Sequence, residues 1–148
     1  MTEVLFYHLE RKPLEDVLPS LLERSVARGW RCVVQVAAER APSLDDLLWT
    51  YAEESFLPHG LEADEGAEQP VVIVSRDSNP NGASVRFLID GAALPQEPHA
   101  YARIVLIFDG RDEAATALAR ERWRETRSLG LAATYWQQND DGRWEKRA

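Results

Sequence analysis

The amino-acid sequence predicts a three-layer α/β/α domain built round a central, largely parallel β-sheet. Apolar runs typical of buried strands alternate with segments in which apolar residues recur at helical spacing. Several of the runs are continuous, as expected for strands that helices cover on both faces. The 148 residues fit one domain, and no repeat, low-complexity segment or linker divides them, so residues 1–148 are interpreted as a single unit.

The first elements are a strand, a helix and a second strand. Residues 3–8 (EVLFYH) are dense in β-formers and predict the first strand. A helix is expected to open at Pro13 and to end at Gly29, while Pro19 inside it predicts a kink or a late start. Residues 31–37 (RCVVQVA) have the length and composition of a buried strand.

The middle of the chain predicts a short helix, a long loop and two further strands. Ser43 is expected to cap a helix over residues 44–51. Residues 54–70 are polar and punctuated by Gly and Pro, which favours loop. Residues 71–75 (VVIVS) and 84–89 predict strands on either side of a turn-rich loop.

The last part predicts a buried strand, a long helix and a hairpin. Residues 103–108 (RIVLIF) form the most continuous apolar run, and a helix from residue 112 to about 129 is closed by Gly130. The tail ATYWQQNDDGRWEK predicts a strand, a turn at residues 140–142 and a short returning strand.

The composition fits a cytoplasmic protein and argues against direct binding of nucleic acid. The formal net charge is −8, whereas sequence-independent DNA binding needs a basic surface. Lys12 and Lys146 are the only lysines, so nearly all positive charge is arginine. The single cysteine, Cys32, lies in an apolar run and is expected in the core. No signal peptide and no apolar run of about 20 residues is visible, so no membrane span is expected.

No catalytic, metal-binding or cofactor-binding motif is found in the sequence. The phosphate loops GxxxxGK[ST] and GxGxxG are absent, and one cysteine with three scattered histidines cannot form a usual zinc site. His8, His59 and His99 lie far apart, without a nucleophile motif beside them. We therefore expect no catalytic residue, no metal and no cofactor. An enzyme on a nucleotide-binding-like fold is the alternative.

Two segments contain candidate binding residues, and the first is WTYAEESFLPHG. Trp49, Phe56 and Leu57 provide large apolar side chains before Pro58. The pattern alone favours a core helix and a loop that covers the core, although large aromatic residues also dominate binding hot spots. Because no catalytic partner is found for His59, it is interpreted as a turn residue.

The second segment is the predicted long helix, DEAATALARERWRETRSLG. Arg120, Arg124 and Arg127 recur at helical spacing and form one basic stripe, with Trp123 three residues beyond Arg120. Two interpretations are open. The stripe is either a solvated face on which neighbouring glutamates are the partners, or a site for an acidic peptide or a terminal carboxylate.

Several stretches together resemble the chi subunit of the bacterial DNA polymerase III holoenzyme. They run nearly from end to end and comprise LFYHLE, SFLPHG, PVVIVS, RIVLIFDG, ARERWRETRSLG and YWQQ…GRW. SFLPHG and ARERW are the most specific of them. The resemblance implies an α/β/α fold akin to nucleotide-binding folds, without a phosphate loop and without a nucleotide.

The same resemblance implies a non-catalytic accessory subunit of the clamp loader in DNA replication, within a DNA-directed DNA polymerase (nucleotidyltransferase) complex. Members of the family pair with a psi subunit and bind the acidic, Phe-terminated C-terminal tail of single-strand-binding protein. They meet DNA only indirectly. Some members also pair with a helicase-like DNA repair protein through the psi-binding surface. The resemblance implies a cytoplasmic location and no membrane partner.

Carried onto this sequence, the binding residues of the family fall on the two segments described above. The implied psi-subunit interface comprises Trp49, Phe56, Leu57 and Pro58. The implied site for the tail of single-strand-binding protein comprises Arg120, Trp123, Arg124 and, by helical spacing, Arg127. Thr116 stands where some relatives carry a basic residue. The GRWEK extension is given no role.

Overall fold

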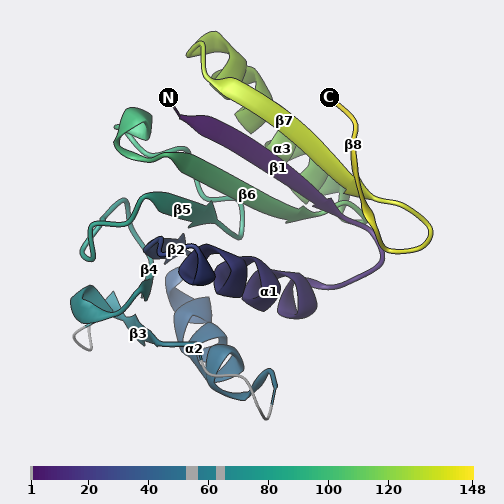
Figure 1. Ribbon diagram of the computed structural model, residues 1–148. Coiled ribbons are helices and arrows are strands. Elements are labelled where there is room, and N and C mark those ends of the chain that lie inside the picture. Colours follow the sequence, from purple (N-terminus) through teal and green to yellow (C-terminus); the bar gives the residue numbers. More distant parts are fainter. Residues whose placement is uncertain (1, 53–56, 63–65) are drawn as a thin grey trace.

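The structure is a computed structural model that describes residues 2–52, 57–62 and 66–148. Within these residues one eight-stranded sheet has the order β3-β4-β2-β5-β6-β1-β7-β8 (Figure 1). Its strands are β1 (Glu3–Leu9), β2 (Cys32–Gln35), β3 (His59–Leu61), β4 (Val71–Val74), β5 (Val85–Leu88), β6 (Arg103–Asp109), β7 (Ala132–Gln138) and β8 (Trp144–Lys146). Neighbouring strands pair in parallel, except β7 and β8, which form an antiparallel hairpin.

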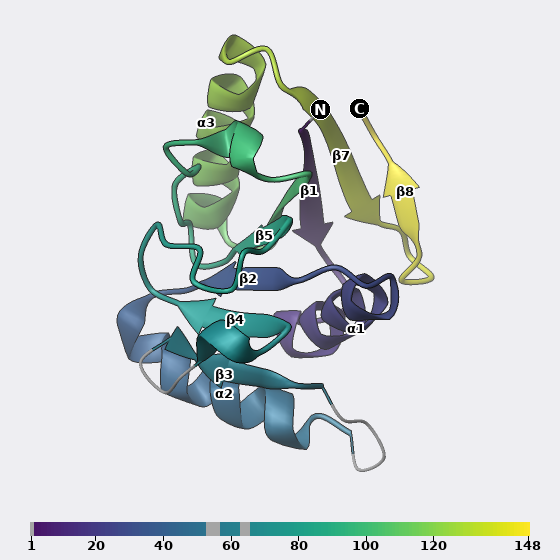
Figure 2. The same cartoon turned by 60° about the vertical axis from the view of Figure 1, so that its left-hand side comes forward.

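Helices cover both faces of this sheet, which makes the three layers. The α-helices are α1 (Leu14–Ala27), α2 (Ala41–Thr50) and α3 (Glu113–Ser128), and the short 3₁₀ turns are η1 (Ala38–Arg40), η3 (Gly66–Glu68) and η4 (Pro98–Ala100). The helices α1 and α2 lie on one face and α3 lies on the other (Figure 2). The predicted α/β/α class with a largely parallel sheet is confirmed.

Alternate residues of each strand enter two separate cores, one on each face of the sheet. On β2, Val34 packs under α1 and α2, whereas Val33 packs on the side of α3. Both side chains are fully buried, as expected for strands covered on both faces. Cys32 lies in the core under α1 and α2, where it is fully buried, so its predicted place in the core is confirmed.

Three local predictions differ from the structure. Ser43 does not cap α2, because the helix already begins at Ala41, and the Ser43 hydroxyl donates back to the Arg40 carbonyl oxygen at 2.9 Å. The late start that Pro19 could have caused is not found, because α1 runs from Leu14 to Ala27 with Pro19 inside it. The segment expected to be loop contains the short strand β3 and the turn η3.

The predicted C-terminal hairpin is confirmed and closes one edge of the sheet. Asn139 organises its turn, since its side-chain oxygen accepts hydrogen bonds from the backbone N–H groups of Asp141 and Arg143. Trp144 of β8 packs edge-on against Tyr7, with ring centroids 4.9 Å apart. The extension therefore covers part of the core under α1.

Candidate functional site

The outer face of α3 carries the predicted basic stripe. Arg120, Arg124 and Arg127 are all exposed. None of the three takes part in an ion pair among the described residues. The neighbouring Glu125 pairs instead with Arg122, at 2.9 Å. The interpretation in which the nearest glutamates neutralise the stripe is therefore not supported at Glu125. The stripe offers guanidinium groups that an external carboxylate can bind.

Trp123 lies on the flank of α3 that faces β1 and β7. Its ring packs edge-on against two others. The ring centroids of Trp123 and Phe6 are 5.2 Å apart with an angle of 67° between the ring planes, and those of Trp123 and Tyr135 are 6.0 Å apart with an angle of 77°. The side chain is half-buried, so only part of the ring is at the surface. Trp123 thus forms an apolar wall beside Arg120, and the packing beneath it keeps that wall in place.

Tyr135 is a neighbour of this wall that the sequence reasoning did not assign to the site. Its hydroxyl lies 2.6 Å from Nδ1 of His8, whose Nε2 lies 2.8 Å from Oε1 of Glu10. Burial raises the pKa of Tyr135, and the positive charge of Arg120 partly offsets that rise in pKa. Arg120 is therefore close enough to act on the Tyr135 ring, which adds a second aromatic residue to the site.

The packing under Tyr135 leaves room for His8 only because residue 110 is glycine. A Cβ atom on Gly110 would overlap the imidazole of His8. The same imidazole lies against Phe108, with ring centroids 5.0 Å apart. Phe108 and Gly110, at the end of β6, therefore fix the position of the His8 ring, and His8 in turn positions the hydroxyl group of Tyr135.

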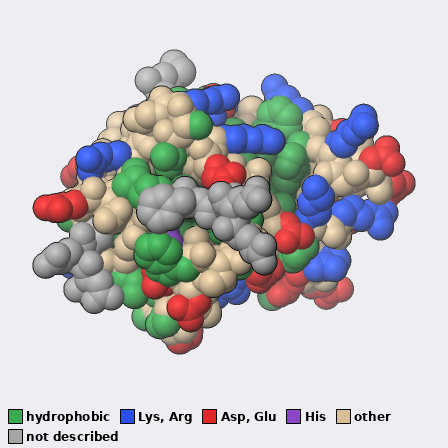
Figure 3. Space-filling view, turned by 60° about the horizontal axis from the view of Figure 1, so that its bottom comes forward, with side chains coloured by type: hydrophobic (Ala, Val, Ile, Leu, Met, Phe, Trp, Pro, Cys, Tyr) green, Lys and Arg blue, Asp and Glu red, His purple; other side chains and the backbone are tan. Residues whose placement is uncertain are grey.

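The other predicted segment places Trp49 at the surface near the end of α2. Its side chain is 53% exposed, and its ring lies 4.5 Å from the ring of His59. Hydrophobic side chains show at the surface on this side of the molecule, among both acidic and basic ones (Figure 3). The psi interface implied by the resemblance requires Trp49 at the surface, and the ring is exposed there.

His59 packs against the ring of Trp49. The sequence had suggested that His59 is a turn residue, and this prediction is wrong. His59 begins β3 and is buried. Its Nδ1 lies 2.7 Å from the carbonyl oxygen of Leu57, and its Nε2 lies 3.1 Å from a carboxylate oxygen of Asp45. These contacts tie β3 to α2, and they fix the surface on which the Trp49 ring rests.

The remaining residues of the implied psi interface are placed differently from Trp49. Leu57 is only 2% exposed and belongs to the core under α1 and α2, so its side chain is not available to a partner. Pro58 is half-buried. Phe56 lies outside the described residues.

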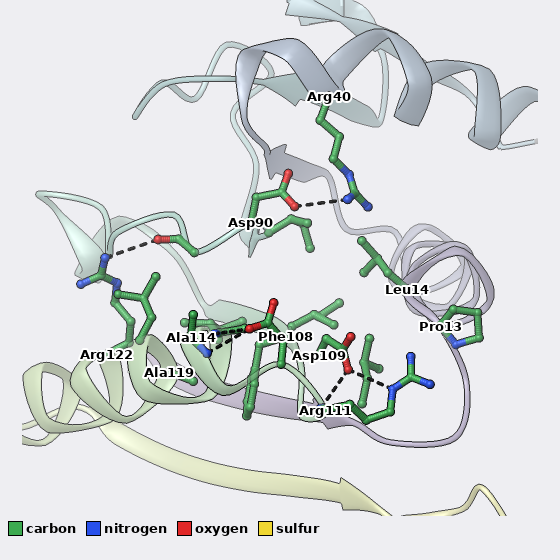
Figure 4. Close-up of a pocket in the computed structure, with 18 of the residues that line it drawn as sticks. Pro13, Leu14, Arg40, Asp90, Phe108, Asp109, Arg111, Ala114, Ala119 and Arg122 are labelled. Atoms are coloured by element: carbon green, nitrogen blue, oxygen red, sulfur yellow. Dashed lines mark hydrogen bonds and ion pairs between the residues drawn. The ribbon is translucent and has the colours of Figure 1, made fainter.

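A cavity of about 620 Å³ opens at the carboxyl ends of β1, β5 and β6 (Figure 4). In open parallel sheets ligands bind at such a place, where the helices that follow two neighbouring strands lie on opposite faces. Here α1 follows β1 and α3 follows β6. The cavity therefore corresponds to the position of a nucleotide in related folds.

Four charged groups that line this cavity are already paired with one another. Arg40 lies 3.4 Å from Asp90, and Arg111 lies 3.2 Å from Asp109. At the start of α3 the carboxylate of Asp112 accepts the N–H groups of residues 114 and 115, which would otherwise face an anion. This arrangement weighs against the nucleotide-binding alternative.

Two further observations concern metals and membranes. Over the described residues, no group of three or more His, Cys, Asp or Glu side chains is placed to hold a metal ion. Within the same part of the chain, no helix has the length and apolar character needed to cross a membrane.

Comparisons with known proteins agree on one family. Residues 1–134 match the family model described as DNA polymerase III chi subunit, HolC. A protein of Rickettsia prowazekii (strain Madrid E), named "Probable DNA polymerase III subunit chi", is 29% identical over 117 residues, which cover 74% of this chain and 71% of that protein. The family match includes α2, α3 and most of the sheet, and it ends before β8.

Proposed function

We propose, on the premise that this chain belongs to the DNA polymerase III chi subunit family, that it joins the clamp loader to single-strand-binding protein. Membership makes the chain an accessory subunit of DNA polymerase III in DNA replication. Its proposed partners are a psi subunit at the Trp49 surface and the acidic C-terminal tail of single-strand-binding protein at α3. The proposed role is non-catalytic.

The observation that carries this proposal is the position of the two surfaces. Trp49 lies near the end of α2, which packs beside β3 at one edge of the sheet. The arginine stripe lies on α3, on the opposite face, next to β7 near the other edge. Two partners can therefore bind at the same time without touching, which is what a bridging subunit requires.

The surface of α3 has the chemistry that an acidic tail ending in Phe needs. Arg120 and Arg124 are exposed and offer charge-assisted hydrogen bonds to carboxylates. Trp123 and Tyr135 form an apolar wall beside them for an aromatic side chain. Thr116 is neutral and adds no charge, and its hydroxyl already donates to the Asp112 carbonyl oxygen within the helix, at 2.9 Å.

The Trp49 surface suits an apolar partner such as a short segment of a psi subunit. Its indole ring is 53% exposed yet rests on the buried His59, so little conformational freedom is lost on binding. Tryptophan is among the residues that contribute most to protein interfaces. The two surfaces therefore offer different chemistry to different partners.

The tail site is tested by titrating a labelled acidic peptide that ends in Phe. Substitution Arg120→Ala should weaken binding by about tenfold or more, because one charge-assisted hydrogen bond contributes about 1.5–3 kcal/mol. Arg76→Ala is the matched control, since it removes an exposed arginine that is paired with Glu62 on another part of the surface. Equal affinity of Arg120→Ala and the wild type would refute the site. Added salt should weaken the binding.

The Trp49 surface is tested independently with a psi subunit. Trp49→Ala should weaken capture of psi while the affinity for the tail peptide stays the same. If Trp49→Ala loses both partners, the two surfaces are not separate. If it loses neither, the psi assignment is wrong.

A further inference from the structure

A second group of arginines surrounds Trp30, on the face of the sheet that α1 covers. We call Trp30, Arg24, Arg28 and Arg103 the Trp30 cluster. The guanidinium carbon of Arg28 lies 5.3 Å from the centre of the indole ring, and that of Arg103 lies 4.9 Å from it. Both distances are those of cation–π contacts, which orient the two guanidinium groups.

The Trp30 cluster lines a small cavity between α1 and the strands β1, β5 and β6. Its volume is about 140 Å³, and its lining contains the three arginines and Tyr7 but no Asp or Glu. In the described part of the chain, none of the three arginines takes part in an ion pair, whereas Arg40, Arg76 and Arg86 elsewhere each have a carboxylate within 4.0 Å. Three arginines without a close carboxylate gather on one cavity in a chain with a net charge of −8, although Glu3 is the register partner of Arg103 on the neighbouring strand β1.

The positive potential of the cluster reaches the hydroxyl group of Tyr7. Burial raises the pKa of this tyrosine, Arg103 and then Arg24 act in the opposite direction, and Glu3 makes a smaller contribution that raises the pKa. The Tyr7 ring also lines the cavity, so a hydroxyl donor lies in the same positive field. Two guanidinium forks and a hydroxyl donor are groups that hold the oxygens of an anion.

The helix dipole does not explain the whole cluster. A basic residue in the last turn of a helix is favourable because of the partial negative charge there, and Arg24 stands in the last turn of α1. Arg103, however, begins β6 and is brought to the same indole by the sheet. Arg103 lies over the Trp30 ring and lines the same cavity, so its planar guanidinium group can offer N–H donors to a ligand there.

We propose that the cavity of the Trp30 cluster is a phosphate-binding site, in which Arg28, Arg103 and Arg24 hold the phosphate oxygens. The charge of three arginines suits a phosphate group better than a singly charged carboxylate. The cavity, of about 140 Å³, has room for one phosphate group. The phosphate belongs either to a free phosphate compound or to the backbone of single-stranded nucleic acid.

This site is separate from the surfaces assigned to psi and to the protein tail. It lies on the face of the sheet opposite to α3, and it uses none of the residues of the two partner surfaces. The inference therefore does not rest on the proposed partners. It would give an acidic accessory subunit one local contact for phosphate.

Two probes identify the source of the phosphate in the full chain. Pyrophosphate is titrated by calorimetry, and a fluorescent oligothymidylate is titrated by anisotropy, each over a range of salt concentrations. The variant Arg28→Gln/Arg103→Gln should weaken binding of the recognised probe by about tenfold or more for each arginine. If the probe is the oligonucleotide, its salt dependence should also become shallower by about 0.7 in log–log slope per arginine.

The charge-matched variant Arg120→Gln/Arg124→Gln separates a built site from general electrostatic attraction. It should bind the phosphate probe as the wild type does, while Arg28→Gln/Arg103→Gln should keep its affinity for the acidic tail peptide. Binding of pyrophosphate alone assigns a free phosphate compound, and binding of the oligonucleotide assigns a nucleic acid backbone. The proposal is overturned if neither probe binds, or if both double variants weaken binding equally. Thermal unfolding of each variant verifies that it is folded.

Discussion

The two faces of the sheet are packed in different ways. Under α1 and α2 the buried core is aliphatic apart from Cys32 and Phe87, with Leu18, Leu22 and Leu48 from the helices, and aromatic rings such as Tyr7 and Trp30 pack at its margin. On the face of α3 the buried side chains include an arginine, Arg86, and three aromatic residues, Phe6, Tyr101 and Phe108. The candidate tail site lies over this second face.

The two kinds of packing contribute differently to the free energy of unfolding. Aliphatic burial contributes about 25 cal/mol per Å² without any requirement for partners. A buried polar group is tolerated only when its hydrogen bonds are satisfied. The α3 face meets most of that requirement with networks that also position side chains at the surface, such as Tyr135 on His8, although Nε of Arg86 has no hydrogen-bond partner.

Arg86 is the extreme case on the α3 face, because its side chain is fully buried. One guanidinium nitrogen donates to the carbonyl oxygen of Ser78 at 2.7 Å, and the other donates to Gln35 at 2.6 Å and to the carbonyl oxygen of Arg76 at 2.9 Å. Asp77 is no closer than 4.0 Å. The arginine thus ties the loop after β4 to the core.

The largest effect is expected from Arg86→Met, which keeps much of the volume but removes the donors. It leaves several buried acceptors unpaired, each at a cost of about 1–3 kcal/mol, so the free energy of unfolding should fall by about 3–5 kcal/mol. Denaturant unfolding measures this change. A variant as stable as the wild type would show that the network of Arg86 orients the loop without net stabilisation.

A slightly smaller loss is expected from Leu22→Ala on the aliphatic face. Leu22 is fully buried, and its truncation should lower the free energy of unfolding by about 2–5 kcal/mol through lost transfer energy and a cavity. Affinity for the tail peptide should not change in the folded variant. A large change in that affinity would contradict the separation of the two faces, and denaturant unfolding with peptide titration on one sample decides between these outcomes.

The layered fold was predictable from the sequence because apolar runs and helical periodicity can be recognised within short stretches of the chain. The run RIVLIF and the periodicity after Asp112 predicted β6 and α3 within one or two residues. The three-residue strand β3 was missed, since a run of that length between Pro58 and η3 has no periodicity to recognise. Tertiary pairing with β4 makes it a strand.

The candidate sites were only partly predictable, for the same reason. The stripe on α3 follows from helical spacing alone. The packing of Trp123 between Phe6 and Tyr135 depends on β1 lying beside β7, which no local pattern encodes. In the other segment, pattern did not separate Trp49 from Leu57, yet the structure exposes the first and buries the second. The Trp30 cluster joins residues from distant segments.

A moderate effect is expected from Gly110→Ala, which acts on the α3 face alone. The new methyl group overlaps His8, so the imidazole must leave Tyr135 and Glu10, at a cost of about 1–3 kcal/mol. The loss of order at Tyr135 should also weaken tail binding. In a His8→Ala background the same substitution should cost much less, and a double-mutant cycle measures this coupling. Additive losses would show that the overlap is not the cause.

The smallest effects are expected in the titration of Tyr7, on the α1 face, and Tyr135, on the α3 face. Burial raises the pKa of both residues, and an arginine on the same face partly offsets each rise, Arg103 for Tyr7 and Arg120 for Tyr135. Because the folded-state pKa is raised, the folded chain holds the phenolic proton more tightly than the unfolded chain. The resulting stability is fully present below a pH of about 10, and it is lost as the pH rises through the folded-state pKa.

Removing each arginine should therefore move one tyrosine and not the other. Arg103→Gln should raise the pKa of Tyr7 further and leave Tyr135 unchanged, while Arg120→Gln should do the reverse, because the sheet separates the two charges. Ring-carbon NMR of selectively labelled tyrosine follows the two residues separately. If either substitution shifts both tyrosines alike, the two arginine groups act as one diffuse field. Independent shifts would show that two separate arginine groups act on opposite faces of one sheet.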